Sequence, residues 1–176
     1  MIGEAVSTFR GDVAEGQTEL RLELPVDAHI PEEYVDSERL RLEAYQKLSA
    51  ASGPAAKDGQ IDLVIDELTD RYGEPPAQVS TLIAVSRLRQ RAQRSGLSDL
   101  IAVGPNLRVT PADLPDSIQT RLRRMYPGAK YLAQTNTVIV PLPRVGDEPL
   151  ADTDLIAWVQ QFLNAIYPLP EGTTSS

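Results

Sequence analysis

The sequence predicts an α+β fold, a single compact domain of several helices packed on a small, mostly antiparallel sheet. Two observations support this prediction. Helical spacing of apolar residues is strongest in the middle of the 176-residue chain. The short apolar segments around it show the alternation and the polar turns that are typical of hairpin strands. Helices and hairpin strands in this arrangement indicate the α+β class.

The chain is expected to begin with a short helix and a polar connector over residues 1–17. Residues 18–24 then alternate polar and apolar side chains with period two, which predicts a strand that Pro25 ends. The apolar face of this strand should consist of Leu20, Leu22 and Leu24.

A turn over residues 30–35 is expected to lead into the next helix. Asp36 or Ser37 can cap this helix, which should run to about Ala50. Its expected core contacts are Leu40, Tyr45 and Leu48. The small residues at 52–59 predict a loop after it.

The most regular helical pattern spans residues 60–72, and Gly73 supplies its C-terminal stop. Its apolar stripe consists of Ile61, Val64, Ile65, Leu68 and Tyr72. At about 100° per residue from Ile61, Asp70 lies near 180°, Leu63 near 200° and Glu67 near 240°. One leucine therefore sits among carboxylates on the face away from the core.

A further helix is predicted from Pro76 to Ser95, with Gly96 as its stop. Its apolar side carries Leu82, Val85, Leu88 and Ala92. Another side carries an arginine stripe, namely Arg87, Arg91 and Arg94. This stripe can contact phosphates or an acidic protein surface, but pairing with the acidic first half of the chain explains it at least as well.

The rest of the chain is expected to alternate shorter elements. Strands are predicted at 97–103, 107–110, 129–133 and 137–140, with a helix from Pro111 or Ala112 to Met125 and a polar turn at 134–136. Asp152 or Thr153 should cap a last helix. Its stripe consists of Leu155, Val159, Phe162, Leu163 and Ile166, with Trp158 beside it as a core residue. Residues 169–176 have the composition of a disordered tail.

The residue types present exclude several kinds of catalytic chemistry. With no cysteine and one histidine, the chain has no thiol nucleophile, disulfide framework or Cys/His zinc site. The single imidazole, His29, lies in a turn beside Pro31, which favours a surface or capping role over that of a base. The adjacent carboxylates are mostly solvated pairs: Glu32/Glu33, Asp66/Glu67 and Asp147/Glu148.

No glycine-rich phosphate loop occurs in the sequence. We therefore expect no catalytic residue, no cofactor and no metal, and a binding or regulatory domain rather than an enzyme. The apolar runs are too short for a bilayer span, and charges interrupt any signal peptide, so a soluble cytoplasmic protein without membrane contact is expected.

The net charge of −8 is unevenly distributed along the sequence. Residues 1–80 hold 17 acidic and 7 basic side chains, whereas residues 81–176 hold 8 acidic and 10 basic ones. An even acidic surface would indicate mainly solubility, while an uneven one leaves room for a charged docking face. Nucleic acid as the main partner is disfavoured because the basic footprint is small.

Four short motifs occur in a fixed order and together become specific. They are IPEEYV at 30–35, RLEAY at 41–45, ELTDRYGEPP at 67–76 and AVSRLR at 84–89. This set resembles the C-terminal domain of the bacterial transcription-repair coupling factors, the Mfd family. The opening GEAV is similar to the end of the helix that closes the translocase motor of that family. The resemblance divides the chain into that helix end and a linker (1–17), the C-terminal domain (18–168) and a tail (169–176).

The resemblance is strongest from about residue 18 to 100, and the 52–59 loop departs from the charged helical segment usual there. Of the 17 basic residues, 14 are arginine, which suits a source with G/C-rich coding.

The resemblance implies a regulatory role inside a larger protein. Family members displace stalled RNA polymerase from damaged DNA and recruit the excision-repair protein UvrA, with ATP hydrolysis in other domains. The C-terminal domain docks on an N-terminal UvrB-like module of the same protein and masks its UvrA-binding surface. The acidic residues of the motif, here Glu67 and Asp70, face that module. Helical spacing puts the same two residues on the outward face around Leu63, so the three are the expected partner-binding residues. UvrA, RNA polymerase and DNA are then indirect partners.

Two other functions remain open at this stage. One is a nucleic-acid-binding module that uses the arginine stripe of Arg87, Arg91 and Arg94. The other is a small metal-dependent hydrolase that uses the carboxylates, which would require an all-oxygen metal site.

Overall fold

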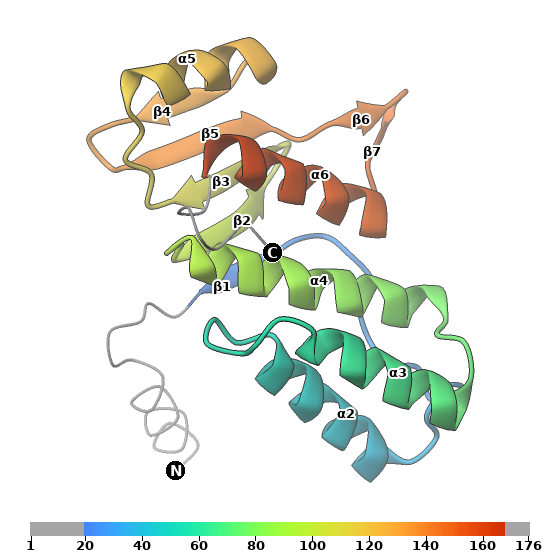
Figure 1. Ribbon diagram of the computed structural model, residues 1–176. Helices are drawn as coiled ribbons and strands as arrows, with labels where there is room; N and C mark the ends of the chain where they lie inside the picture. Colours follow the sequence, from blue (N-terminus) through green and yellow to red (C-terminus); the bar gives the residue numbers. More distant parts are fainter. Residues whose placement is uncertain (1–19, 168–176) are drawn as a thin grey trace, which may run out of the picture. The chain divides into compact units, whose positions relative to one another are not determined.

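The computed structural model describes residues 20–167, so the predictions for residues 1–17 and for the tail lie outside the described residues. The described chain divides into two compact units, one of residues 20–24 and 92–142 and one of residues 25–91 and 143–167. Together these residues contain five helices, a five-stranded sheet and a two-stranded hairpin, which confirms the α+β class (Figure 1). No helix in this range is long and apolar enough to cross a membrane.

The first unit is built on the five-stranded sheet. Its strands are β1 (Arg21–Glu23), β2 (Asp99–Val103), β3 (Asn106–Thr110), β4 (Lys130–Leu132) and β5 (Thr137–Pro141). Their order is β1-β2-β3-β5-β4, and every neighbouring pair is antiparallel except β1 with β2. Each strand was expected from the sequence, although β1 is shorter than predicted. The alternation in β1 is confirmed, because Arg21 and Glu23 are exposed while Leu20 is buried.

The helix of the first unit, α5 (Asp116–Met125), begins later than the sequence predicted. Pro115 occupies its N-cap position with an extended backbone, φ −66° and ψ 164°. A residue that precedes proline disfavours helical geometry, so Leu114 cannot easily continue a helix from Ala112. The amide of Ala112 instead donates to the carbonyl of Asn136 at 2.7 Å. Residues 111–115 therefore form an extended connection.

The second unit contains α2 (Glu38–Ala51), α3 (Gln60–Tyr72) and most of α4 (Ala77–Arg94). The boundary between the units falls after Arg91, in the last turn of α4. The predicted bounds of α3 and the Ser37 cap of α2 are confirmed, because the Ser37 hydroxyl accepts from the Leu40 amide at 3.3 Å. One apolar cluster joins the three helices. Its buried helical members are Ala44, Leu48, Ala51, Ile61, Leu68, Val79 and Ile83. The predicted contacts Leu40, Tyr45, Val64, Ile65, Tyr72 and Leu82 are partly buried against it.

The second unit also contains a hairpin that the sequence did not predict and the last helix. The hairpin consists of β6 (Arg144–Val145) and β7 (Glu148–Pro149). In α6 (Asp152–Ile166) the predicted stripe is confirmed, since all five members are buried. The predicted cap is wrong: Ala151 occupies the N-cap, and the Asp152 carboxylate accepts from the Asp27 amide at 2.9 Å instead. Trp158 is only partly buried and stacks on Phe162, with ring centroids 5.9 Å apart.

Candidate functional site

The face of α3 opposite its buried stripe carries the three predicted partner-binding residues. Leu63 is 61% exposed, and Asp70 is also exposed. Glu67 is half-buried. Because the three are spaced i, i+4 and i+7, they form one row about 10 Å long on the helix. The structure therefore presents them together, although in different environments.

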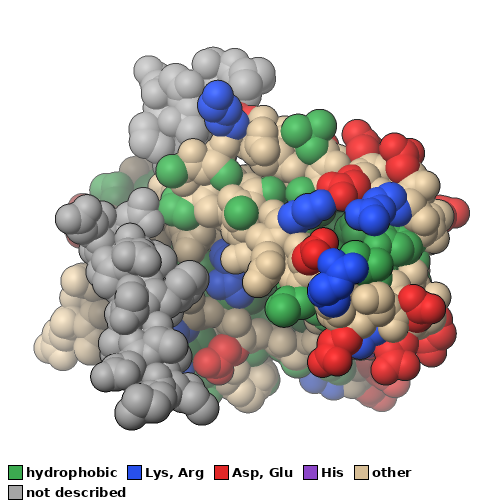
Figure 2. All heavy atoms as spheres, turned by 90° about the horizontal axis from the view of Figure 1, so that it is seen from below, with side chains coloured by type: hydrophobic (Ala, Val, Ile, Leu, Met, Phe, Trp, Pro, Cys, Tyr) green, Lys and Arg blue, Asp and Glu red, His purple; other side chains and the backbone are tan. Residues whose placement is uncertain are grey.

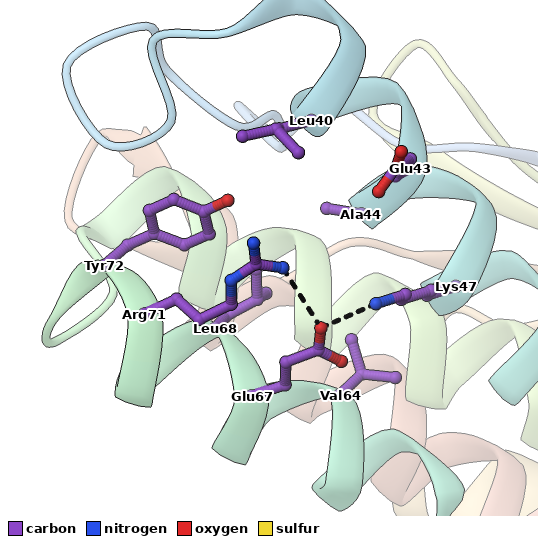
Figure 3. A pocket seen from close by; sticks show the side chains of 9 residues that line it. All are labelled: Leu40, Glu43, Ala44, Lys47, Val64, Glu67, Leu68, Arg71 and Tyr72. Carbon is purple, nitrogen blue, oxygen red and sulfur yellow. Dashed lines mark hydrogen bonds and ion pairs between the residues drawn. The ribbon is translucent and has the colours of Figure 1, made fainter.

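Glu67 is turned toward α2 and is not a free carboxylate. Its Oε2 atom accepts from Lys47 Nζ at 2.6 Å and from the guanidinium of Arg71 at 3.4 Å (Figure 3). The hydrogen bond from Lys47 is the main reason that the pKa of Glu67 lies below its ordinary value, and the charges of Lys47 and Arg71 add to this effect against partial desolvation. Both contacts use Oε2, so Oε1 stays available to an external donor.

A small pocket lies beside this ion-pair cluster, between α2 and α3. Figure 3 shows its lining of Leu40, Glu43, Ala44, Lys47, Val64, Glu67, Leu68, Arg71 and Tyr72. The cavity volume is about 10 Å³, enough for about one water molecule. It is too small for a metabolite, so the chemistry of this region is that of a surface. Figure 2 shows a surface on which basic and acidic side chains alternate around apolar ones.

The other carboxylates of α3 differ in their pairing. Asp62 Oδ1 accepts from the Arg87 guanidinium of α4 at 2.6 Å. Asp66 and Asp70 are exposed, and neither has an ion-pair partner within residues 20–167. Asp66 and Asp70 therefore leave unbalanced negative charge near Leu63, whereas the charge of Glu67 is balanced by Lys47 and Arg71.

The arginine stripe of α4 is used within the chain. Arg87 pairs with Asp62, as the sequence analysis considered. The Arg91 guanidinium donates to the carbonyls of Leu163 and Tyr167, at 3.1 and 2.6 Å, and to Asn164 Oδ1 at 3.0 Å. These acceptors lie at the C-terminal end of α6, where the last carbonyls lack helical partners. The stripe therefore stabilises the second unit, and Arg94 at its end is half-buried.

The remaining candidates for chemistry are solvated surface groups. His29 is exposed and its Nδ1 lies 2.8 Å from Asp27 Oδ1. Among the described residues, no three His, Asp or Glu side chains are grouped in a way that could hold a metal ion.

The sequence analysis did not identify Lys47 and Arg71 as neighbours of the candidate site. Arg71 could have been found, because it follows Glu67 by four residues on a helix. Lys47 could not, because its contact depends on the packing of α2 against α3.

Comparisons with known proteins match most of the chain. The model of the TRCF domain family matches residues 24–119. Transcription-repair-coupling factors of Mycobacterium bovis and Mycobacterium tuberculosis are each 43% identical to the chain over 97% of its length, and one of Staphylococcus haemolyticus is 28% identical over 77%. The chain spans only about 15% of the length of the mycobacterial relatives.

A solved structure described as the C-terminal domain of transcription-repair coupling factor has the same fold. Its TM-score is 0.63 at 15% identity, and the match covers 85% of this chain and 95% of the solved one.

Proposed function

The chain belongs to the TRCF domain family, the C-terminal domain of the transcription-repair coupling factors, and from that membership we propose that it is an autoinhibitory docking domain. In this proposal it docks on an N-terminal UvrB-like module of its parent protein and masks the surface that binds UvrA. Catalysis belongs to the rest of the parent, which would carry the contacts with RNA polymerase and DNA.

The observation that carries the proposal is the row of Leu63, Glu67 and Asp70 on α3. Leu63 offers exposed apolar area, and on the same face Asp66 and Asp70 have no ion-pair partner within residues 20–167. Arginines on the partner can meet Asp70 and Glu67 Oε1 through charge-assisted hydrogen bonds, which fix the register of docking. Removal of the leucine from water adds non-directional stabilisation.

The internal pairing of Glu67 gives that residue a particular part in docking. Lys47 and Arg71 hold its carboxylate in one position, so little side-chain entropy is lost when a partner binds Oε1. Asp70 has no such support and contributes mainly its charge. We therefore expect Glu67 to determine geometry and Asp70 to determine the salt dependence.

A weak contact suffices for autoinhibition because the partner is tethered in the same protein. Effective concentrations in such cases are about millimolar, which keeps the docked state dominant even at modest affinity. Release then needs only a few kcal/mol of competing interaction from the parts of the parent that engage polymerase.

The test is a titration of this chain with the isolated UvrB-like module. We expect the double variant Glu67→Ala/Asp70→Ala to remain folded and to bind about 10- to 100-fold more weakly, with the larger loss at low salt. The control, Asp113→Ala/Asp147→Ala, removes the same charge from exposed positions that are not part of α3. Unchanged affinity of the α3 variant, or an equal loss in the control, would refute docking through this face.

A further inference from the structure

The α3 face belongs to the second unit. The first unit carries most of a strongly basic segment, which was not predicted from the sequence as a binding site. The segment from residue 117 to 146 contains five cationic side chains and no Asp or Glu, although the net charge of the whole chain is −8. The four that belong to the first unit are Arg121, Arg123, Arg124 and Lys130, and we call them the α5 basic face. All four side chains are exposed.

Helix geometry places the arginines away from the buried side of α5. Leu122 is 1% exposed and marks the inward direction. At about 100° per residue, Arg121, Arg123 and Arg124 all lie 100° or more from it. Exposed Ser117 and Thr120 lie on the same outward half. The outward half of α5 therefore carries guanidinium and hydroxyl groups, and Met125 is exposed at the C-terminal end of the helix.

The fourth cation is brought to α5 by the connection to β4. The amide of Ala129 donates to the carbonyl of Tyr126 at 3.0 Å, which closes the short link between the helix and the strand. At the other end of the helix, the Leu114 amide donates to the Tyr131 hydroxyl of β4 at 3.3 Å. Strand β4, which begins at Lys130, is the edge strand of the sheet, and Figure 1 shows α5 beside it.

Two structural roles account for part of this charge. Arg123 and Arg124 lie in the last turn of α5, where cations interact favourably with the helix dipole. A lysine on an edge strand discourages pairing with other chains. Neither role requires hydroxyls among the arginines or the absence of carboxylates over the whole segment. Both roles also predict effects on stability or association alone, which separates them from ligand binding.

We propose that the α5 basic face binds the phosphate backbone of a nucleic acid without reading its sequence. Guanidinium groups pair bidentately with phosphate oxygens, and serine and threonine hydroxyls donate to the same oxygens. A helix of ten residues is about 15 Å long and can contact several successive phosphates. An acidic protein segment is the competing occupant. It is less favoured because the hydroxyls of Ser117 and Thr120 suit phosphate oxygens, and the large exposed apolar side chains of α5 and β4 are only Met125 and Leu132. The proposal is independent of docking through α3.

The experiment measures fluorescence anisotropy of a labelled DNA duplex of about 20 base pairs, titrated with this chain from about 50 to 200 mM salt. About four neutralised phosphates predict a slope of log K against log salt of roughly −3 to −4. The variant Arg123→Glu/Arg124→Glu should lose at least about tenfold in affinity. The control Arg39→Glu/Lys57→Glu makes the same charge change at exposed positions of the second unit and should lose much less.

Three outcomes would overturn the proposal. One is no binding at about 50 mM salt, and another is an equal loss in both double variants. The third is displacement of the DNA by polyglutamate at equal charge concentration, which would identify an acidic protein as the occupant. If the charge reversal unfolds the chain, Arg124→Gln/Lys130→Gln replaces it. That milder variant should still lower both the affinity and the salt slope.

Discussion

Helix α4 carries four arginines and helix α5 carries three, but the structure uses the two sets differently. On α4, Arg87 is bound to Asp62 and Arg91 to the last carbonyls of α6. On α5, Arg123 and Arg124 are exposed and have no ion-pair partner within residues 20–167. The same residue type therefore stabilises the fold on α4, whereas Arg123 and Arg124 on α5 are exposed to solvent. The neighbouring elements decide which role applies.

The largest expected effect tests the α4 side of this comparison. Arg91→Ala should lower the free energy of unfolding by about 2–3 kcal/mol, because the half-buried carbonyls at the end of α6 lose a charged donor. Arg123→Ala, by contrast, should change it by less than about 0.5 kcal/mol. Urea unfolding followed by circular dichroism measures both.

Arg91→Lys is the informative control for this prediction. It keeps the charge but loses the planar fork that reaches several acceptors, so its cost should fall between those of the two alanine variants. Equal costs for Arg91→Ala and Arg123→Ala would show that the two arginine sets do not differ in the way proposed.

A smaller effect is expected for the pair of Arg87 and Asp62. Both side chains are largely exposed, at 44% and 62%, so the short distance of 2.6 Å does not indicate a strong contribution. A double-mutant cycle with Arg87→Ala and Asp62→Ala should give a coupling energy of about 0.2–1 kcal/mol. The coupling should shrink at about 1 M salt, where exposed charges are screened. A coupling energy of zero at low salt would mean that Arg87, like Arg123 and Arg124, gains no stability from an ion pair.

Local sequence patterns predicted correctly the elements that have one clear pattern, such as an apolar row at helical spacing. The bounds of α3 follow from five apolar residues in a helical row and from Gly73, whose φ of +90° suits glycine. The stripe of α6 follows in the same way. These predictions hold because burial of a continuous apolar face decides both the type of element and its orientation.

The predictions that failed depend on contacts between distant residues or on short elements. The cap of α6 was missed because Asp152 bonds the amide of Asp27, which is 125 residues away in the sequence. The two-residue strands of the β6–β7 hairpin are too short to show any alternation. At the candidate site, helical spacing placed Leu63 and Asp70 correctly on an exposed face. It could not show that Lys47 of α2 binds Glu67, because no local pattern contains packing between helices.

The smallest expected effect concerns the comparison of paired and unpaired carboxylates. Glu67 is paired, with Lys47 and Arg71. Because its folded pKa lies below the ordinary value, the ion-pair cluster stabilises the fold above the ordinary pKa. This stabilisation is lost as the pH falls through the lower folded pKa. The difference in unfolding free energy between the natural chain and Glu67→Gln should therefore shrink as the pH is lowered from neutrality into that range.

The partners of Glu67 provide a stricter test of its environment, and NMR titration of the side-chain carboxyl carbon measures it directly. Lys47→Met should move the pKa of Glu67 back up toward its ordinary value, because the Lys47 hydrogen bond of 2.6 Å is the main cause of the shift. Arg71→Met should move it less, since that contact is 3.4 Å long. The reverse order would mean that Arg71, rather than Lys47, is the main cause of the pKa shift of Glu67.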